Sequence, residues 1–354
     1  MFYLLAMQVY IIYTRKKEIK WLGLALFLFI LSCLSKGQAV TLAPTLILVD
    51  LFLGRKWSSM QVLLEKVPFF ILSMIFGIVA IRAQAGADAT IMANFPFIQR
   101  IAFASYGLLM YVIKLVVPYP LSAYYPYPIV SGGEEVPFGY WLAIIPAVAF
   151  LAVWIISYRK SKPLFFGISF FLVNIFLLLQ LLPVGRAIMA DRYAYIPSIG
   201  FVFLAGWYLN DRKIIPSQTI SLIILGVYVV FLGILTFERG KVWKDSMTLW
   251  SDVLEKNSRV PVAWYNRGNL KIDSGDYQGA IADYSEALNV DEGYWKAYIN
   301  RGNAKNQLKN YLGAIEDFNA VLAIDSGAVN AYVNRANSYK LLGDPASAIR
   351  DYDR

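Results

Sequence analysis

The sequence contains no histidine, one cysteine and few charged residues, which make up 16% of the chain. Without histidine, His-dependent general-base catalysis and zinc sites with His ligands are excluded. One cysteine excludes a disulfide within the chain, and Cys33, which lies in an apolar run, is expected to be a small core residue. Soluble proteins average near 25% charged residues, whereas 58% of this chain is hydrophobic. Most of the protein is therefore expected to lie in lipid.

The remaining charge is divided unevenly between two regions. Residues 1–237 hold 18 Lys and Arg against 8 Asp and Glu, a net charge of +10, whereas residues 238–354 hold 15 against 16, a net charge of −1. This asymmetry predicts a multi-spanning membrane domain over 1–237 and a second region of different character after it.

Apolar runs in the first region predict membrane-spanning helices, which need about 20 apolar residues. The candidates are residues 68–83, 141–157, 163–182, 197–209 and 220–236, with short helices at 21–34 and 41–53. Residues 1–13 are apolar but too short to span, and we interpret them as the stump of a longer helix.

Basic residues predict which face of the membrane is cytoplasmic, because Lys and Arg accumulate there. They form four clusters, at residues 15–20, 55–66, 159–162 and 212–213. If all four are cytoplasmic, the turn at 35–38, segment 183–196 and everything after 220–236 lie on the opposite face. Residues 97–117 are then expected to lie in the outer interface or to re-enter the membrane; otherwise one assigned span is wrong.

A repeat with a period of 34 residues begins at Pro261. The repeated positions include Ala263, Ala297 and Ala331; Arg267, Arg301 and Arg335; and Ala280, Ala314 and Ala348. The pattern resembles the tetratricopeptide repeat, in which small residues let two helices approach and an aromatic fills the groove. The same register continues upstream, which predicts a docking half repeat over 238–260, followed by repeats over 261–354 with the third truncated. The expected fold is all-α: a polytopic membrane helix bundle followed by a tetratricopeptide-repeat α-solenoid.

One position of each repeat predicts a peptide-binding surface. Such repeats bind peptides on a concave face, and the ninth position of each unit there is Asn269, Asn303 or Asn337. Amide side chains can hold an extended backbone because each offers a donor and an acceptor. Alternatively, these asparagines only cap and space the helices. The fifth position lacks the Lys that binds C-terminal carboxylates, which argues against that ligand.

Six basic residues fall outside the cytoplasmic clusters: Lys36, Arg82, Arg100, Lys114, Arg186 and Arg192. Few acidic residues share their face; those assigned to it are Asp88, Glu134, Glu135 and Asp191. A cation near hydrocarbon usually has an anionic partner or a function, and phosphate oxygens suit both Lys and Arg. We predict phosphate binding at Lys36, Arg186 and Arg192. Arg82 and Lys114 fit helix ends that extend to lipid headgroups.

Two motifs carry a resemblance to a known family. They are residues 34–44, which include the turn Ser35-Lys36-Gly37-Gln38, and residues 190–201, which include Asp191-Arg192-Tyr193-Ala194-Tyr195-Ile196-Pro197. Both resemble the integral-membrane GT-C glycosyltransferases, most closely the transmembrane and tetratricopeptide-repeat O-mannosyltransferase-like proteins, although Glu usually stands at the position of Gly37. The order of membrane helices, half repeat and repeat array is also similar.

The resemblance implies a glycosyltransferase that moves a sugar from a polyprenyl-phosphate donor to a hydroxyl acceptor, which we expect to be a protein. It implies that Lys36 and Arg192 contact the donor phosphate and that Tyr195 borders the site. The resemblance implies a catalytic Asp in the first external loop, and we expect that loop to lie upstream of the segment that this sequence covers. The expectation is therefore that the chain is inactive alone, with no catalytic residue assigned.

Two other interpretations remain open. The protein could be a non-enzymatic membrane scaffold that displays a peptide-binding array, or a polymerase or ligase of surface polysaccharide. The expected partners are membrane lipid, a lipid-linked sugar and a protein or peptide, with no nucleic acid; no resident metal is assigned. The repeat style favours a bacterial inner membrane with periplasmic repeats, and the endoplasmic reticulum remains an alternative.

Overall fold

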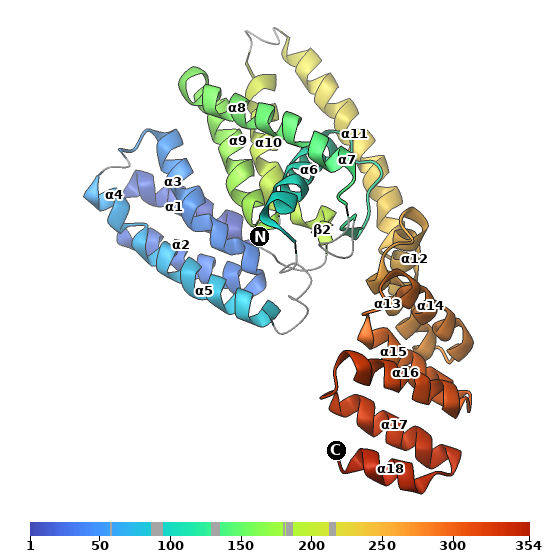
Figure 1. Cartoon of the computed structure of the whole chain (residues 1–354). Helices are drawn as coiled ribbons and strands as arrows, with labels where there is room; N and C mark the ends of the chain where they lie inside the picture. The colour runs from blue at the N-terminus through green and yellow to red at the C-terminus, as the bar shows by residue number, and fades with distance from the viewer. Residues whose placement is uncertain (57–58, 86–94, 129–134, 180, 182–186, 212–216) are drawn as a thin grey trace. The chain divides into compact units, whose positions relative to one another are not determined.

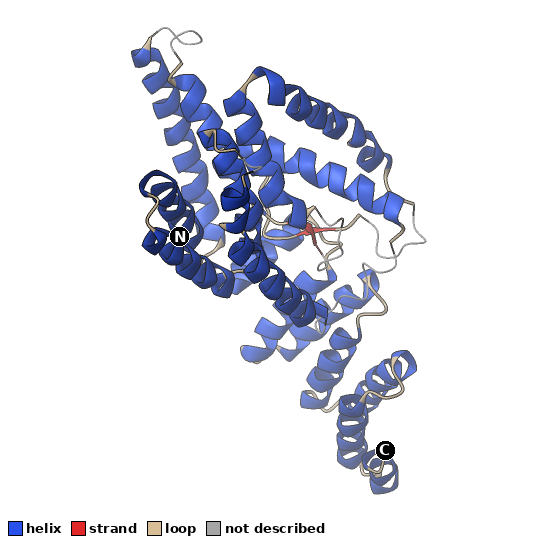
Figure 2. Ribbon diagram, turned by 90° about the vertical axis from the view of Figure 1, so that its left-hand side faces the viewer, coloured by secondary structure: helices blue, strands red, loops and turns tan. Residues whose placement is uncertain are grey.

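The computed structural model describes residues 1–56, 59–85, 95–128, 135–179, 181, 187–211 and 217–354. The described chain is almost entirely helical, with one short two-stranded sheet (Figure 2). The predicted all-α class is confirmed. The chain forms two compact units, Met1–Phe231 and Leu232–Arg354. The predicted limits at residues 237 and 260 stay predictions.

The first unit contains the apolar helices (Figure 1). Its helices are α1 (Phe2–Lys16), α2 (Ile19–Ser35), η1 (Gly37–Thr41), α3 (Leu42–Leu53), α4 (Met60–Leu64), α5 (Val67–Ala85), α6 (Phe97–Val116), α7 (Phe138–Leu142), α8 (Ile144–Lys160), α9 (Lys162–Ile175), η3 (Phe176–Leu178), η4 (Asp191–Tyr193), α10 (Tyr195–Leu209) and most of α11 (Gln218–Val242). Four described segments are long and apolar enough to cross a membrane: Met60–Ala83, Phe97–Val116, Phe138–Lys160 and Gln218–Val242. Residues 97–116 thus form one unbroken helix, and their place in the membrane stays a prediction.

The turn between α2 and α3 distinguishes the two ends of the first unit; the two helices pack mainly on other helices, α2 on α1 and α3 on α9, and not on each other as a hairpin. The chain turns between them at Lys36 and η1, and α3 then runs back beside α9 in the opposite direction. At the start of α9 the Lys162 amine lies 5.8 Å from the centre of the Phe52 ring. At its end Asn174 bonds to Thr41 at the start of α3. Lys162 and Phe52 therefore mark one end, which we call the basic end, and Lys36 lies at the other.

The basic cluster at residues 55–66 lies at the basic end because it directly follows the end of α3. The cluster at 15–20 lies there too, since Tyr13, just before it, donates a hydrogen bond to Glu65 at 2.8 Å. The predicted cluster at 212–213 lies outside the described residues. The structure thus separates Lys36 from the described members of the basic clusters.

Two glycines allow α9 and α10 to pack closely. A Cβ atom at Gly200 would overlap the carbonyl oxygen of Gly167, and a Cβ at Gly167 would overlap the side chain of Leu204. Small residues at such crossings let helices in lipid gain van der Waals contact over their full faces. This crossing fixes α10, which begins directly after η4, against the helix that carries Asn174.

The second unit is built from the repeats. Its helices are α12 (Ser246–Lys256), α13 (Pro261–Asp273), α14 (Tyr277–Val290), α15 (Trp295–Gln307), α16 (Tyr311–Ile324), α17 (Val329–Leu342) and α18 (Pro345–Tyr352). Successive helices pack against each other along the array (Figure 1). The second helix of each repeat is capped in the same way, by a side chain that accepts the amide three residues on; the capping residues are Asp276, Asn310 and Asp344.

All three repeats contain the same ion pair, and a buried aromatic residue closes the first two. Tyr284 and Phe318 are fully buried, and each ring occupies the space that a Cβ on Gly268 or Gly302 would need. The repeated arginines bond the aspartates sixteen residues later, in the pairs Arg267–Asp283, Arg301–Asp317 and Arg335–Asp351 at 2.8, 2.7 and 2.6 Å. The packing roles predicted from the 34-residue period are therefore present in the structure.

Candidate functional site

Lys36 and Arg192 lie at the same place in the structure, on one tyrosine ring. The Lys36 amine is 5.1 Å from the centre of the Tyr193 ring, and the Arg192 guanidinium carbon is 4.9 Å from it. Lys36 follows the last residue of α2, whereas Arg192 lies in η4, so the contact joins segments 156 positions apart in the sequence. Both residues are exposed. We call Lys36, Arg192 and Tyr193 the cation site.

The electrostatics of the cation site favour an anion. Loss of solvent around the amine lowers the pKa of Lys36, and the positive charge of Arg192 lowers it further. Within the described part of the chain, no carboxylate forms an ion pair with either residue. Arg192 instead donates to the Ala123 carbonyl at 3.2 Å and to the Tyr193 hydroxyl at 3.3 Å. An anion placed here would relieve the repulsion between two cations.

Of the other two residues predicted to bind the phosphate, Tyr195 and Arg186, the structure describes only Tyr195. Tyr195 is 78% exposed at the start of α10, and its side chain forms no hydrogen bond or cation–π contact with Lys36 or Arg192, both of which the structure describes. Arg186, together with the acidic residues Asp88 and Glu134, lies outside the described residues. The structure therefore brings together Lys36 and Arg192, and it adds Tyr193, which lies within a recognised motif but was not assigned a role.

Asp191 fixes the segment that carries Arg192. Its carboxylate accepts hydrogen bonds from the Ser122 amide at 2.9 Å and from the Tyr125 hydroxyl at 3.0 Å. Tyr125 also lies in β1 (Tyr125–Pro126), which pairs with β2 (Ala187–Met189) just before η4. The carboxylate next to Arg192 thus bonds to the loop at 122–125, which positions η4.

Lys114 lies near the end of α6 and contacts the segment that follows this helix, which differs from its predicted role at a helix end in contact with lipid. It is buried, donates to the Pro120 carbonyl, and lies 5.0 Å from the centre of the Tyr125 ring. The reason is that the chain after α6 folds back over its last turn and covers the amine.

A buried polar network around Asn174 lies next to the cation site and supports it. Asn174 is fully buried; its amide oxygen accepts from Tyr3 at 2.8 Å and from Thr41 at 2.6 Å, and its amide nitrogen donates to Thr45 at 3.2 Å. Gln38 donates to the backbone carbonyls of Asn174 and Tyr193, both at 3.3 Å. Sequence reasoning missed this network. Its signal was the amide of Asn174 in the middle of the apolar run at 163–182, since polar residues within such runs often serve function.

A second buried network lies at the basic end. Arg55 bonds both Asp50 and Glu65, at 3.0 and 2.8 Å, and the Lys66 amine contacts Asp50 and the hydroxyl of Tyr10. Asp50 is fully buried and Lys66 nearly so. Two residues of a predicted basic cluster are therefore neutralised by carboxylates inside the protein.

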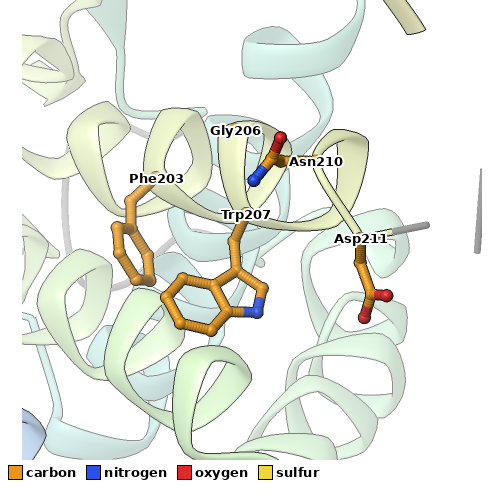
Figure 3. Close-up of a pocket in the computed structure, with 5 residues that line it drawn as sticks. All are labelled: Phe203, Gly206, Trp207, Asn210 and Asp211. Carbon is orange, nitrogen blue, oxygen red and sulfur yellow. The ribbon is translucent and has the colours of Figure 1, made fainter. Parts of the chain in front are cut away.

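A cavity of about 520 Å³ lies at the end of α10, away from the cation site. Phe203, Gly206, Trp207, Asn210 and Asp211 line it, with the rings of Phe203 and Trp207 side by side (Figure 3). None of the predicted site residues lines this cavity.

The three repeated asparagines differ in their surroundings. Asn269 accepts a hydrogen bond from the Tyr284 hydroxyl at 2.7 Å, and Asn337 accepts one from Tyr352 at 2.6 Å. The equivalent aromatic in the middle repeat is Phe318, which has no hydroxyl, and the exposed Asn303 side chain bonds no other described residue. Spacing of helices thus explains part of the role of Asn269 and Asn337, and Asn303 is the member whose amide is open. Peptide binding by these residues stays a prediction.

Comparisons with known proteins agree with this architecture. The tetratricopeptide repeat family matches residues 261–294 and 296–327. Protein O-mannosyl-transferase TMTC3 from Homo sapiens is 28% identical over 110 residues, 30% of this chain and 12% of that protein. Protein O-mannosyl-transferase F38B6.6 from Caenorhabditis elegans is 27% identical over 281 residues, 75% of this chain and 39% of that protein. The first tetratricopeptide repeat domain of Spaghetti (RPAP3), solved with an HSP90 peptide, covers 27% of this chain and 77% of its own, with 26% identity and a TM-score of 0.27.

The chain is thus an all-α protein of apolar helices followed by tetratricopeptide repeats. It is similar to the repeat-bearing protein O-mannosyl-transferases, which confirms the resemblance inferred from its motifs. The match spans less than two fifths of the length of these relatives.

Proposed function

We propose that this chain forms part of a membrane glycosyltransferase that takes a sugar from a polyprenyl-phosphate donor and passes it to a hydroxyl acceptor. The observation that carries the proposal is the cation site, where Lys36 and Arg192 share the Tyr193 ring without a carboxylate partner among the described residues. The named activity of the relatives in the comparison supports sugar transfer to protein.

The cation site suits the leaving group of such a reaction. When the acceptor hydroxyl attacks the anomeric carbon, the bond to the donor phosphate breaks and negative charge grows on the phosphate oxygens. The hydroxyl proton passes to a general base that is not assigned in this chain. A fixed lysine and arginine would stabilise that charge in the transition state. Arginine can present two parallel N–H groups to phosphate, and lysine adds a compact point charge.

The proposed place of the cation site is the non-cytoplasmic face, opposite the basic end of the bundle. A polyprenyl phosphate would lie there with its chain in lipid and its headgroup between Lys36 and Arg192. The repeats would dock the acceptor protein through their concave surface. The open amide of Asn303 supports this role because it can bond a backbone donor and acceptor together.

Lipid-phosphate binding tests the proposal. The purified chain in phosphatidylcholine nanodiscs would be titrated with a polyprenyl monophosphate, with the corresponding polyprenol as the neutral reference. Lys36→Gln and Arg192→Gln should each weaken phosphate binding by about tenfold or more, since a hydrogen bond to a charged group contributes roughly 1.5–3 kcal/mol. Polyprenol binding should not change.

Matched controls remove the same charges at the basic end. Lys56→Gln and Arg15→Gln, both at exposed positions, should leave phosphate affinity unchanged. Equal affinity for the phosphate and the polyprenol in the unsubstituted chain would contradict the proposal and favour the scaffold interpretation.

A further inference from the structure

A cavity of about 360 Å³ lies in the repeat array between α13, α14 and α15. Its size suits one long side chain. Its walls combine an apolar part, formed by Ile272 and Ala304, with a polar rim of Asp273, Asn303 and Gln307. Only Asn303 of this rim belongs to the repeated asparagines.

The floor of the cavity is held in one arrangement by hydrogen bonds. The Asn269 oxygen accepts from the Tyr284 hydroxyl at 2.7 Å and from the Asn300 amide at 2.8 Å, and the same Asn300 amide donates to Tyr265 at 3.2 Å. Tyr284 is fully buried. A ligand would therefore meet a preorganised surface, which lowers the entropic cost of binding.

The rim, in contrast, is open. The side chains of Asp273, Asn303 and Gln307 form no hydrogen bond or ion pair with any other residue that the structure describes. Asp273 is the only charged residue among those that line the cavity. The rim therefore offers one negative charge and two amide groups to a ligand.

Three lysines near this cavity in the sequence do not neutralise its rim. Lys271 and Lys305 both point to the repeat ion pairs, where they bond Asp283 and Asp317 at 2.9 Å. Lys296 lies on α15, eleven residues before Gln307, which places it about 16 Å away along the helix at 1.5 Å per residue. That distance exceeds the screening length of about 8 Å at physiological salt.

We propose that this cavity binds the side chain of a lysine or arginine from an extended polypeptide segment. The aliphatic stem would lie against Ile272 and Ala304, and the Tyr277 ring would line the same space. The charged end would reach Asp273, with amide oxygens of Asn303 and Gln307 as further acceptors. This inference rests on the proposed docking role of the repeats and gives its specificity: a basic residue in the docked segment.

Binding of three peptides to the full chain tests the inference. The probes are short fluorescein-labelled peptides of glycine, serine and threonine with a central lysine, norleucine or glutamate, measured by fluorescence anisotropy. Zwitterionic phosphatidylcholine nanodiscs prevent the lysine peptide from binding anionic lipid. We expect the lysine peptide to bind about three- to fivefold more tightly than the norleucine peptide, the effect of a partly exposed ion pair. The glutamate peptide should bind most weakly.

Two variants locate the effect. Asp273→Asn should abolish the preference for lysine, and raised salt should do the same. Glu292→Gln removes the same charge from an exposed position that does not line the cavity, and it should keep the preference. Both positions are exposed, so circular dichroism should show unchanged helix content.

The outcomes separate this inference from the docking role. If the three peptides bind equally, or if Asp273→Asn keeps the preference, the basic-side-chain site is wrong while docking stands. If none of the peptides binds the array, peptide docking itself is contradicted.

Discussion

Two pairs of cations lie at the two ends of the first unit, and they differ in whether the protein supplies an anionic partner. Lys66 is buried and Arg55 partly buried against the carboxylates of Asp50 and Glu65. Lys36 and Arg192 meet on an aromatic ring, exposed, and no carboxylate among the described residues pairs with them. The same two residue types thus serve structure where the protein supplies the anion, and can serve binding where a ligand must supply it.

The largest expected effect is a loss of stability when the ion pairs at the basic end are broken. Asp50→Ala leaves Lys66 and Arg55 without their shared partner, and removing one member of a buried pair costs about 3–5 kcal/mol. Thermal unfolding of the chain in detergent should show this loss of stability. A combined Asp50→Ala and Lys66→Ala variant should recover part of it; a double variant less stable than Asp50→Ala alone would contradict the pairing.

The next effect concerns the buried polar network that supports the cation site. Asn174→Leu leaves the hydroxyls of Tyr3, Thr41 and Thr45 without their amide partner, which should cost about 1–3 kcal/mol. It should also weaken binding of polyprenyl phosphate, because Gln38 bonds both the Asn174 and Tyr193 carbonyls. Asp50→Ala is the reference, since at temperatures where it stays folded it should bind the phosphate normally. Equal phosphate affinity in Asn174→Leu and the unsubstituted chain would show that the Asn174 network does not support the cation site.

At the cation site itself, loss of one cation should barely change the stability of the chain. Lys36→Gln and Arg192→Gln remove no ion pair, so unfolding free energies should stay within about 0.5 kcal/mol of the original. Relief of like-charge repulsion would even raise stability slightly. A loss as large as that of Asp50→Ala would show that these cations have a structural partner, and it would remove the contrast between the two ends.

The smallest effect is a pH dependence of phosphate binding. The folded-state pKa of Lys36 is lowered, so the folded chain releases this proton at a lower pH than the unfolded chain. Affinity for the phosphate should therefore fall as pH rises through the lowered pKa, below the ordinary lysine value of about 10.4. Stability should rise slightly in the same window, because the unfolded chain still binds the proton. Lys36→Arg keeps its charge there, and its affinity should stay constant; a parallel fall in both proteins would assign the titration elsewhere.

The sequence predicted the features that depend on local pattern. Apolar runs predicted the helices, the 34-residue period predicted the repeats, and Lys36 and Arg192 could be singled out because they fall outside the basic clusters. The contacts that define the site were beyond reach. Tyr3 and Asn174 are 171 residues apart, and their hydrogen bond depends on how four helices pack. For the same reason, the partners of Arg55 and Lys66 could not be told from their charge alone.

The middle repeat shows how little separates a structural amide from one that can meet a partner. In the first and third repeats a tyrosine hydroxyl occupies the asparagine oxygen, and in the second a phenylalanine leaves it unoccupied. The missing hydroxyl of Phe318 is thus one reason why the Asn303 oxygen keeps its bonding capacity, whereas the Asn269 oxygen accepts from Asn300 as well as from Tyr284. A periodic sequence can in this way carry a single, non-periodic point of attachment.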